Sequence, residues 1–252
     1  MSTKTSIEWT EQTWNPTTGC TKISPGCKNC YAEVMARRLK AMGVKGYEKG
    51  FTLTLQPNRL EEPIKRKKPT VYFVNSMSDL FHEEIPDGYI RKVFDVIEKS
   101  PQHTFQILTK RAERMVHLLK QYKIPSNAWL GVTVENKKHG VPRIDKLRMV
   151  NVFVRFLSVE PLLEDLGDLD LKEINWVIVG GESGLKARLM RPEWINNIKQ
   201  QCEKNNIAFF FKQWGGWGSD GKKRAKKKNG RILFGRTWDN MPVIPQPTHV
   251  TC

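Results

Sequence analysis

Short strand-like runs alternate with helical patterns along most of the chain, and this alternation constrains the fold more than any other feature. Eight β-branched or apolar runs predict strands: 14–19, 51–55, 71–74, 105–108, 129–134, 152–157, 176–179 and 208–211. Between them, apolar residues recur every three or four positions, as in 89–97, in 112–119 and after Pro192. The alternation predicts an α/β fold, and the eight-fold count favours a parallel (β/α) barrel, complete or partial.

The strand-helix repeat ends near residue 214, where the composition shifts to glycine and then to lysine. We therefore expect a barrel in residues 1–214 and a small, basic, glycine- and lysine-rich extension with a C-terminal tail in 215–252. No run approaches the 18 apolar residues that a membrane-spanning helix needs, and the first residues contain no apolar stretch typical of a signal peptide. These features predict a cytoplasmic protein that does not associate with a membrane.

The chain is strongly basic. It has 42 Lys and Arg against 26 Asp and Glu, a formal net charge of +16. Seven of the basic residues lie between Lys222 and Arg231, among them Lys222, Lys223 and Arg224, and a second run covers Lys65 to Lys68. Either run alone is typical of a solvated loop, but the two together with a pI near 9.7 favour a polyanionic partner, most commonly nucleic acid. The sequence does not distinguish DNA from RNA.

Polar residues follow most of the expected strands. In a parallel barrel the loops at the carboxyl ends of the strands converge on one face, where active sites are found. Turns also use such residues, but their number here predicts a polar cavity. The candidates for binding a ligand in it are Asp79, Lys110, Arg111, Glu160, Gly180, Gly181, Glu182, Lys212 and Trp214.

Three of the five cysteines, Cys20, Cys27 and Cys30, share one loop rich in glycine and proline. An odd cysteine count without a secretory signal argues against a disulfide framework. Three thiolates on one loop can bind zinc or an iron–sulfur cluster. A closed zinc site needs a fourth ligand, for which His82 is the best candidate, whereas three thiolates on a four-iron cluster leave one iron open to substrate.

The cysteine loop after a first strand, ending in Cys-x-x-Cys and followed by strand-helix units, resembles radical S-adenosylmethionine (SAM) enzymes. The segments WNPTTGC, CKNCYAE, NSMSDLFHE, LTKRAERM, LGVTVEN, SVEPLL, WVIVGGESG and KQWGG more closely resemble a phage-type family of unassigned function that partners the three-Cys-motif partner protein. Some members of that family are described as similar to spore photoproduct lyase, which repairs thymine lesions in DNA. The resemblance runs from about Trp14 to Pro242.

The sequence departs from the common radical SAM pattern in three respects. Six residues separate Cys20 from Cys27, where the common pattern has three. The aromatic residue usually found before the third cysteine is replaced by Tyr31 after it. The Gly-Gly-Glu element follows the seventh expected strand and not the second.

The resemblance implies a [4Fe-4S] cluster on the three cysteines, and SAM on the open iron. It implies SAM contacts from Asp79, Glu160, Gly180, Gly181 and Glu182. Substrate contacts are expected from Lys110, Arg111, Lys212, Trp214, Lys222, Lys223 and Arg224. No catalytic side chain is identified.

The expected function is therefore a radical SAM enzyme that repairs or modifies nucleic acid or a nucleotide-derived substrate. One alternative is a radical SAM enzyme that modifies a peptide or a partner protein. Another is a zinc-stabilised nucleic-acid-binding protein without catalytic activity. The three-Cys-motif partner protein is a possible binding partner.

Overall fold

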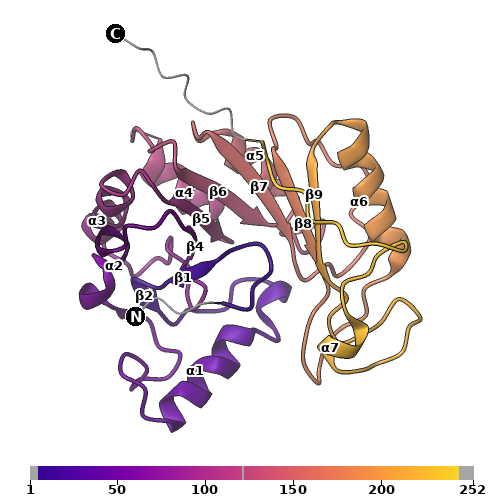
Figure 1. The fold of residues 1–252 in the computed structure, drawn as a ribbon, viewed down its shortest axis with the longest axis horizontal. Coiled ribbons are helices and arrows are strands. Elements are labelled where there is room, and N and C mark those ends of the chain that lie inside the picture. The colour runs from indigo at the N-terminus through magenta and orange to yellow at the C-terminus, as the bar shows by residue number, and fades with distance from the viewer. Residues whose placement is uncertain (1–4, 121, 244–252) are drawn as a thin grey trace.

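A curved sheet of seven parallel strands forms the centre of the computed structural model, which describes residues 5–120 and 122–243 (Figure 1). Its strands, in spatial order, are β1 (Gln12–Trp14), β4 (Val71–Val74), β5 (Thr104–Thr109), β6 (Ala128–Thr133), β7 (Val154–Val159), β8 (Trp176–Gly180) and β9 (Ala208–Gln213). Every neighbouring pair is parallel, and β1 and β9 form the two edges. The sheet is thus a partial barrel, which confirms the expected fold class.

Two of the eight expected strands differ from the prediction. The run 14–19 divides into the end of β1 and a separate strand β2 (Thr17–Thr18), because Pro16 has no N–H to continue the ladder. The run 51–55 contributes only β3 (Thr54–Leu55), which pairs antiparallel with β2 in a small second sheet. The central sheet therefore has seven strands, not eight.

Three of the helices follow the predicted apolar patterns. The α-helices are α1 (Tyr31–Ala41), α2 (Glu62–Lys65), α3 (Asp87–Glu98), α4 (Ala112–Leu119), α5 (Pro142–Arg148), α6 (Pro192–Lys204) and α7 (Lys226–Asn229), with 3-10 turns at Pro25–Cys27 and Pro57–Arg59. The patterns at 89–97 and 112–119 form α3 and α4, and α6 begins at Pro192 as expected. The buried faces of α3, α4 and α6 pack on the convex side of the sheet in one large core.

Aromatic side chains fill the concave side of the sheet towards the amino ends of its strands. Trp9 lies 4.6 Å from Phe73 and 6.0 Å from Trp176 between ring centroids, and Phe156 and Phe210 complete the same cluster. Since side chains alternate between the faces of a strand, the concave positions further along the strands are Lys110, Thr133, Ser158, Gly180 and Lys212. The carboxyl-terminal part of the concave face is therefore polar.

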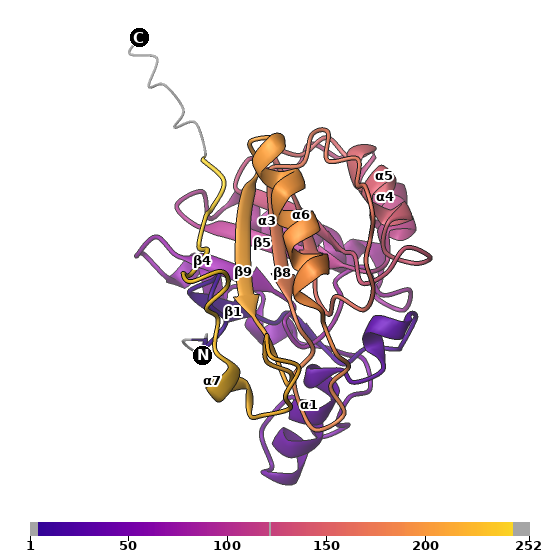
Figure 2. The ribbon, with the colours of Figure 1, turned by 90° about the vertical axis from the view of Figure 1, so that its right-hand side faces the viewer.

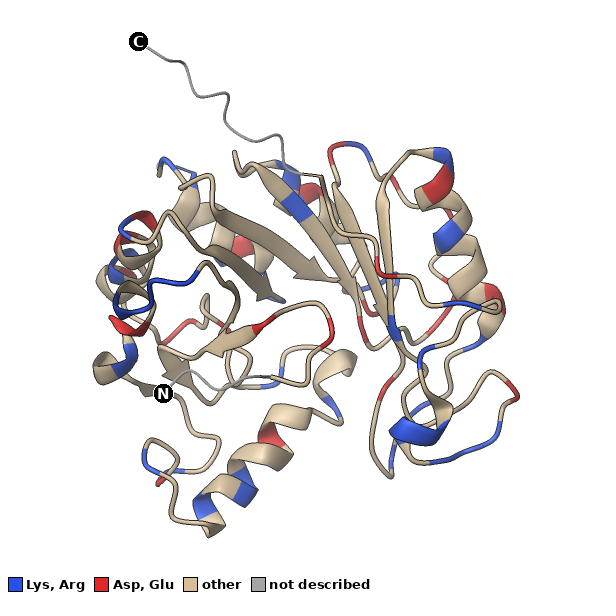
Figure 3. Ribbon diagram, viewed as in Figure 1, with Lys and Arg blue, Asp and Glu red and all other residues tan. Residues whose placement is uncertain are grey.

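After β9 the chain turns back along this edge of the sheet (Figure 2). Phe210 forms an antiparallel bridge with Asp239, and the Phe211 N–H donates to the Trp238 carbonyl at 2.9 Å. The segment between them carries α7 and an exposed run of Lys and Arg (Figure 3). Within the described residues, no helix is long and apolar enough to cross a membrane.

Candidate functional site

The cysteine loop joins β2 to α1 and lies at the carboxyl-terminal end of the curved sheet, with α1 below β1 and β2 in Figure 1. Cys20, Cys27 and Cys30 are all partly exposed and free. Three buried carboxylates that follow β4, β6 and β8 hold this loop: Asp79, Glu135 and Glu182.

The contact with β8 centres on the Glu182 carboxylate. Its Oε2 accepts hydrogen bonds from Asn29 Nδ2 and from the backbone N–H and Nε of Arg188, each at 2.9 Å, and its Oε1 lies 2.5 Å from Arg188 Nη2. Arg188 Nη1 also donates to the Pro25 carbonyl at 3.0 Å. Burial raises the pKa of Glu182, but these hydrogen bonds outweigh it and lower the pKa overall. Glu182 thus tethers two points of the loop.

The contact with β6 depends on a glycine. A Cβ added at Gly26 would lie 3.1 Å from Glu135 Cγ and 3.2 Å from its Cδ. Glu135 is fully buried and pairs with Arg143 Nη1 at 2.6 Å. Burial raises the pKa of Glu135, whereas hydrogen bonds from Arg143 and Ser24 lower it overall. The loop therefore rests directly on a buried ion pair.

The third contact comes from the ends of β4 and β5. Asp79 accepts hydrogen bonds from the Phe81 N–H at 3.0 Å, the Thr109 hydroxyl at 2.7 Å and the Lys110 N–H at 3.1 Å. Its Oδ2 also lies 3.2 Å from Arg111 Nη1, which donates to Cys20 Sγ at 3.4 Å. Asp79 therefore acts on the first cysteine through a buried guanidinium.

The cysteine thiols differ in their electrostatic surroundings. Burial and the Asp79 charge raise the pKa of Cys20 to about 11, although Arg111 opposes them. Burial acts the same way on Cys27, but the Lys110 ammonium and hydrogen bonds from the loop lower its pKa overall. Lys110 therefore lies close enough to Cys27 to favour its thiolate, which is the form that binds metals.

The donor set fits an iron–sulfur cluster, because three free thiols of one loop are the soft ligands that such clusters take. In residues 5–120 and 122–243, no three His, Cys, Asp or Glu side chains are grouped as a ready single-ion site. The expected fourth zinc ligand, His82, is buried and has both ring nitrogens occupied. Its Nε2 lies 2.9 Å from the Thr21 hydroxyl, and its Nδ1 accepts the Glu84 N–H at 3.2 Å.

An ion pair occupies the polar part of the concave face. Lys212 Nζ lies 3.0 and 2.9 Å from the two Glu160 oxygens, and Gln213 Nε2 lies 3.3 Å from Glu160 Oε1. The Gln213 Oε1 and Thr133 Oγ1 atoms are buried without a hydrogen-bond partner among the described residues. Buried polar atoms of this kind ordinarily have partners, so this face can accept further hydrogen bonds from a ligand.

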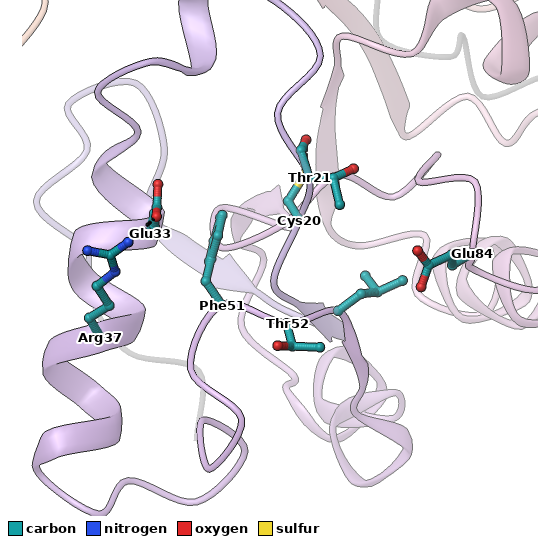
Figure 4. Close-up of a pocket in the computed structure, with 8 residues that line it drawn as sticks. Cys20, Thr21, Glu33, Arg37, Phe51, Thr52 and Glu84 are labelled. Atoms are coloured by element: carbon teal, nitrogen blue, oxygen red, sulfur yellow. Dashed lines mark hydrogen bonds and ion pairs between the residues drawn. The ribbon is translucent and has the colours of Figure 1, made fainter.

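A pocket of about 440 Å³ opens on another side of Cys20. Figure 4 shows Glu33 and Arg37 of α1 on one side of it and Glu84 on the other. Thr21, Phe51, Thr52 and Leu53 complete its lining. Its volume is within the range of small-molecule sites.

Comparison with known proteins assigns the chain to a family. The model of the family described as "Protein of unknown function (DUF5131)" matches residues 4–242. The chain belongs to this family. No curated protein matches it in sequence.

Its fold is similar to solved structures of spore photoproduct lyase. One is the enzyme complexed with dinucleoside spore photoproduct, at 14% identity and a TM-score of 0.47. Another is a double mutant with bound AdoMet and dinucleoside spore photoproduct, at 15% identity and a TM-score of 0.47. In both, the match covers 81% of this chain and 64% of the other, so the chain spans less than two thirds of their length.

The structure does not bring the five expected SAM contacts together. Glu160 and Gly180 lie on the concave face, where a Cβ at Gly180 would be 3.1 Å from Glu160 Cδ. Asp79 and Glu182 instead hold the cysteine loop. Gly181 packs against the backbone of Trp214, because a Cβ at Gly181 would lie 2.0 Å from the Trp214 carbonyl oxygen.

Two expected substrate contacts are not available at the surface. Trp214 is 3% exposed, and its Nε1 donates to the Ile232 carbonyl at 2.8 Å, so its ring has no free face for a base. Arg111 is buried beside Cys20. Lys110 and Lys212 remain partly exposed.

Much of the basic run is exposed, but several of its charges have partners within the chain. Lys223 Nζ donates to the Leu185 carbonyl and lies 5.4 Å from the Trp217 ring centroid. Arg224 pairs with Asp220 at 2.5 Å. The others with acidic partners are Lys226, with Glu8, and Arg231, with Asp239. In the described part of the chain, no ion pair involves Lys222, Lys227 or Lys228.

Sequence reasoning missed four residues that hold the loop, Asn29, Glu135, Arg143 and Arg188. Glu135 directly follows the expected strand 129–134, and this position could have marked it as a candidate site residue. The other three lie in a loop or at the start of a helix, and nothing in their spacing marks them.

Proposed function

We propose that this chain is a radical SAM enzyme whose Cys20, Cys27 and Cys30 hold a [4Fe-4S] cluster. The observation that carries the proposal is that three free thiols share one loop, which is tethered to three strand ends of a parallel partial barrel. When bound, such a cluster supplies the electron that cleaves SAM to methionine and a 5′-deoxyadenosyl radical. Binding SAM and excluding water from it would be done by residues of the chain.

Glu160 and Lys212 are the residues best placed to bind SAM. The pair presents a carboxylate and an ammonium to the concave face, which complements a ligand that carries both charges. Glu160 would accept hydrogen bonds from the SAM ammonium or the ribose hydroxyls, and Lys212 would pair with its carboxylate. The buried Thr133 and Gln213 oxygens offer two further acceptors.

The aromatic cluster on the same face, towards the amino ends of the strands, would exclude water from the reacting atoms. Trp9, Phe73, Trp176 and Phe210 pack there in one cluster, and each is less than 9% exposed. Exclusion of water protects reactive intermediates from side reactions. Asp79 and Glu182 would act as supports of the cluster loop and would not contact SAM.

The substrate class that we propose is nucleic acid, DNA or RNA, or a compound derived from a nucleotide. The net charge of +16 and the exposed basic extension support it. In this proposal the chain consists of a barrel, 1–214, and a basic extension, 215–252. Lys222, Lys227 and Lys228 of the extension are the phosphate contacts. A cytoplasmic location remains part of this proposal.

A peptide or partner protein is the second candidate substrate, because apolar side chains are exposed close to the cysteine loop. Leu185 is 93% exposed and Val34 is 69% exposed, and Tyr31, Met35 and Ile23 are also exposed. Exposed apolar groups that gather in one region are typical of protein-binding sites. The three-Cys-motif partner protein is a candidate for this surface.

The test is reductive cleavage of SAM. Anaerobically reconstituted protein, reduced with dithionite, should form 5′-deoxyadenosine, and a Cys30→Ala variant should not. Product formation should rise when a nucleic acid substrate is present. Absence of 5′-deoxyadenosine above the variant's background, with or without nucleic acid or peptide, would overturn the proposal.

A further inference from the structure

The Arg111 guanidinium is bound at all five of its N–H groups. Nε donates to Glu83 Oε2 at 2.8 Å. Nη1 donates to Asp79 Oδ2 at 3.2 Å and to Cys20 Sγ at 3.4 Å. Nη2 donates to the carbonyl and the hydroxyl oxygen of Thr21 at 3.2 and 2.9 Å. A guanidinium has five such donors, so none is left for a substrate.

These partners come from separate parts of the chain. Asp79 and Glu83 lie in the loop after β4, and Arg111 directly precedes α4. Cys20 and Thr21 begin the cysteine loop. The Arg111 side chain is only 3% exposed, so its charge is compensated by the two carboxylates and not by water. The guanidinium therefore joins the cysteine loop rigidly to the ends of β4 and β5.

We propose that Arg111 is the positioning residue of the cluster site: it fixes Cys20 in the loop and donates a charge-assisted hydrogen bond to its sulfur. The claim that Arg111 fixes Cys20 concerns the protein without a cluster. The claim that Arg111 acts on the cluster through the Cys20 sulfur rests on the proposed function. Hydrogen bonds and positive charge beside a ligating sulfur stabilise the more negative, reduced cluster, so Arg111 raises the reduction potential.

A lysine cannot replace this arrangement. Its ammonium carries the same charge but has three donors and no planar fork, so it cannot reach Asp79, Glu83, Cys20 and Thr21 together. Arg111→Lys therefore keeps the charge and loses most of the geometry. Arg111→Met removes both, and it leaves two acidic side chains without their cation.

The experiment compares these two variants with Arg114→Lys. Arg114 lies in α4, just after Arg111, and binds the His82 and Ile85 carbonyls and Asp87, but not Cys20. In cluster-free protein, maleimide labelling of Cys20 is followed peptide by peptide over a range of pH and expressed per thiolate, because Arg111 also favours the thiolate. This rate should be about tenfold faster in Arg111→Lys than in the wild type. Arg114→Lys should label at the wild-type rate.

In reconstituted protein, the cluster potential is measured by redox titration with paramagnetic resonance detection. It should become more negative in the order wild type, Arg111→Lys, Arg111→Met, while Arg114→Lys stays at the wild-type value. A purely structural role would lower cluster occupancy without shifting the potential. Thermal melts of each variant show whether it is folded, and Arg111→Lys keeps the test valid where Arg111→Met does not fold.

Two results would overturn the proposal: a Cys20 labelling rate in Arg111→Lys equal to that of the wild type, or a cluster potential that no Arg111 variant changes. If the wild type binds no cluster at all, the proposed function fails, and the labelling rates still decide whether Arg111 fixes Cys20.

Discussion

Asn29 Nδ2 donates to Glu182 Oε2 at 2.9 Å, although 153 positions separate the two residues. This contact joins the cysteine loop to the end of β8. Two further contacts, through Arg111 and through Gly26, join the same loop to the ends of β5 and β6. The loop that carries the three thiols is therefore preorganised by the sheet before any cofactor binds.

Loss of the Glu182 charge should destabilise the fold. Glu182→Gln removes a buried carboxylate that accepts four hydrogen bonds, so the free energy of unfolding at pH 7 should fall by about 2 kcal/mol. Urea unfolding measures the change. Glu203→Gln, which breaks an exposed pair with Lys199, is the matched control and should change stability little.

The same comparison has a defined pH dependence. Because the folded protein lowers the pKa of Glu182, its contribution is complete above the unfolded value of about 4.3 and is lost as the pH falls through the lower folded value. The stability difference between wild type and Glu182→Gln should therefore shrink below about pH 4.3. A difference that stays constant down to acid unfolding would contradict this role.

A side chain at Gly26 should disturb the loop. Gly26→Val places branched carbons against the buried Glu135, and overpacking of this kind costs about 1–3 kcal/mol. Iron content after reconstitution should fall with it. Gly88→Ala is the control, because nothing lies within 4 Å of a Cβ there and the site is helical, so it should be neutral or stabilising.

The Glu160–Lys212 pair predicts a specific defect in SAM binding. Glu160→Gln and Lys212→Met should each weaken SAM binding by about tenfold while cluster content stays normal, because neither residue contacts the cysteine loop in a hydrogen bond. Equilibrium dialysis of reconstituted protein measures the affinity, with Lys199→Met as control. Wild-type affinity in both variants would place the SAM site elsewhere.

Three lysines of the basic extension should contact phosphate. In the triple variant Lys222→Gln, Lys227→Gln and Lys228→Gln, the slope of log affinity against log salt should fall by at most about 0.9 per lysine on duplex DNA. Fluorescence anisotropy measures the slope on DNA and on RNA. The control neutralises Lys65, Lys67 and Lys68, which precede β4 and so lie at the opposite end of the sheet. Equal effects of the two triple variants would indicate non-specific attraction only.

The sequence predicted the elements whose apolar patterns are long. The run 129–134 and the periodic pattern 112–119 each formed the expected element, because burial decides the structure there: β6 is buried on both faces, and α4 is buried on one. The run 51–55 has the same strand-like composition, but only Thr54–Leu55 forms a strand, which pairs antiparallel with β2 in the small sheet. The run's own residues do not indicate which strand it pairs with. Pro16 was the visible signal that the first strand would end early.

The sequence marks the three cysteines of the candidate site, but not the residues that hold their loop. Cys20, Cys27 and Cys30 are marked by spacing. Arg111 and Glu182 were correctly found at strand ends, but as expected ligand contacts. Their role in holding the loop depends on contacts across the fold, which spacing along the chain does not record.

Iron and sulfide analysis after anaerobic reconstitution, with an absorption spectrum, tests the central claim most directly. The wild type should be brown and contain about four irons and four sulfides per chain. Cys20→Ala, Cys27→Ala and Cys30→Ala should each lose them, whereas Cys202→Ala, at a buried position in α6, should retain them. A colourless protein with stoichiometric zinc and no iron would contradict the account.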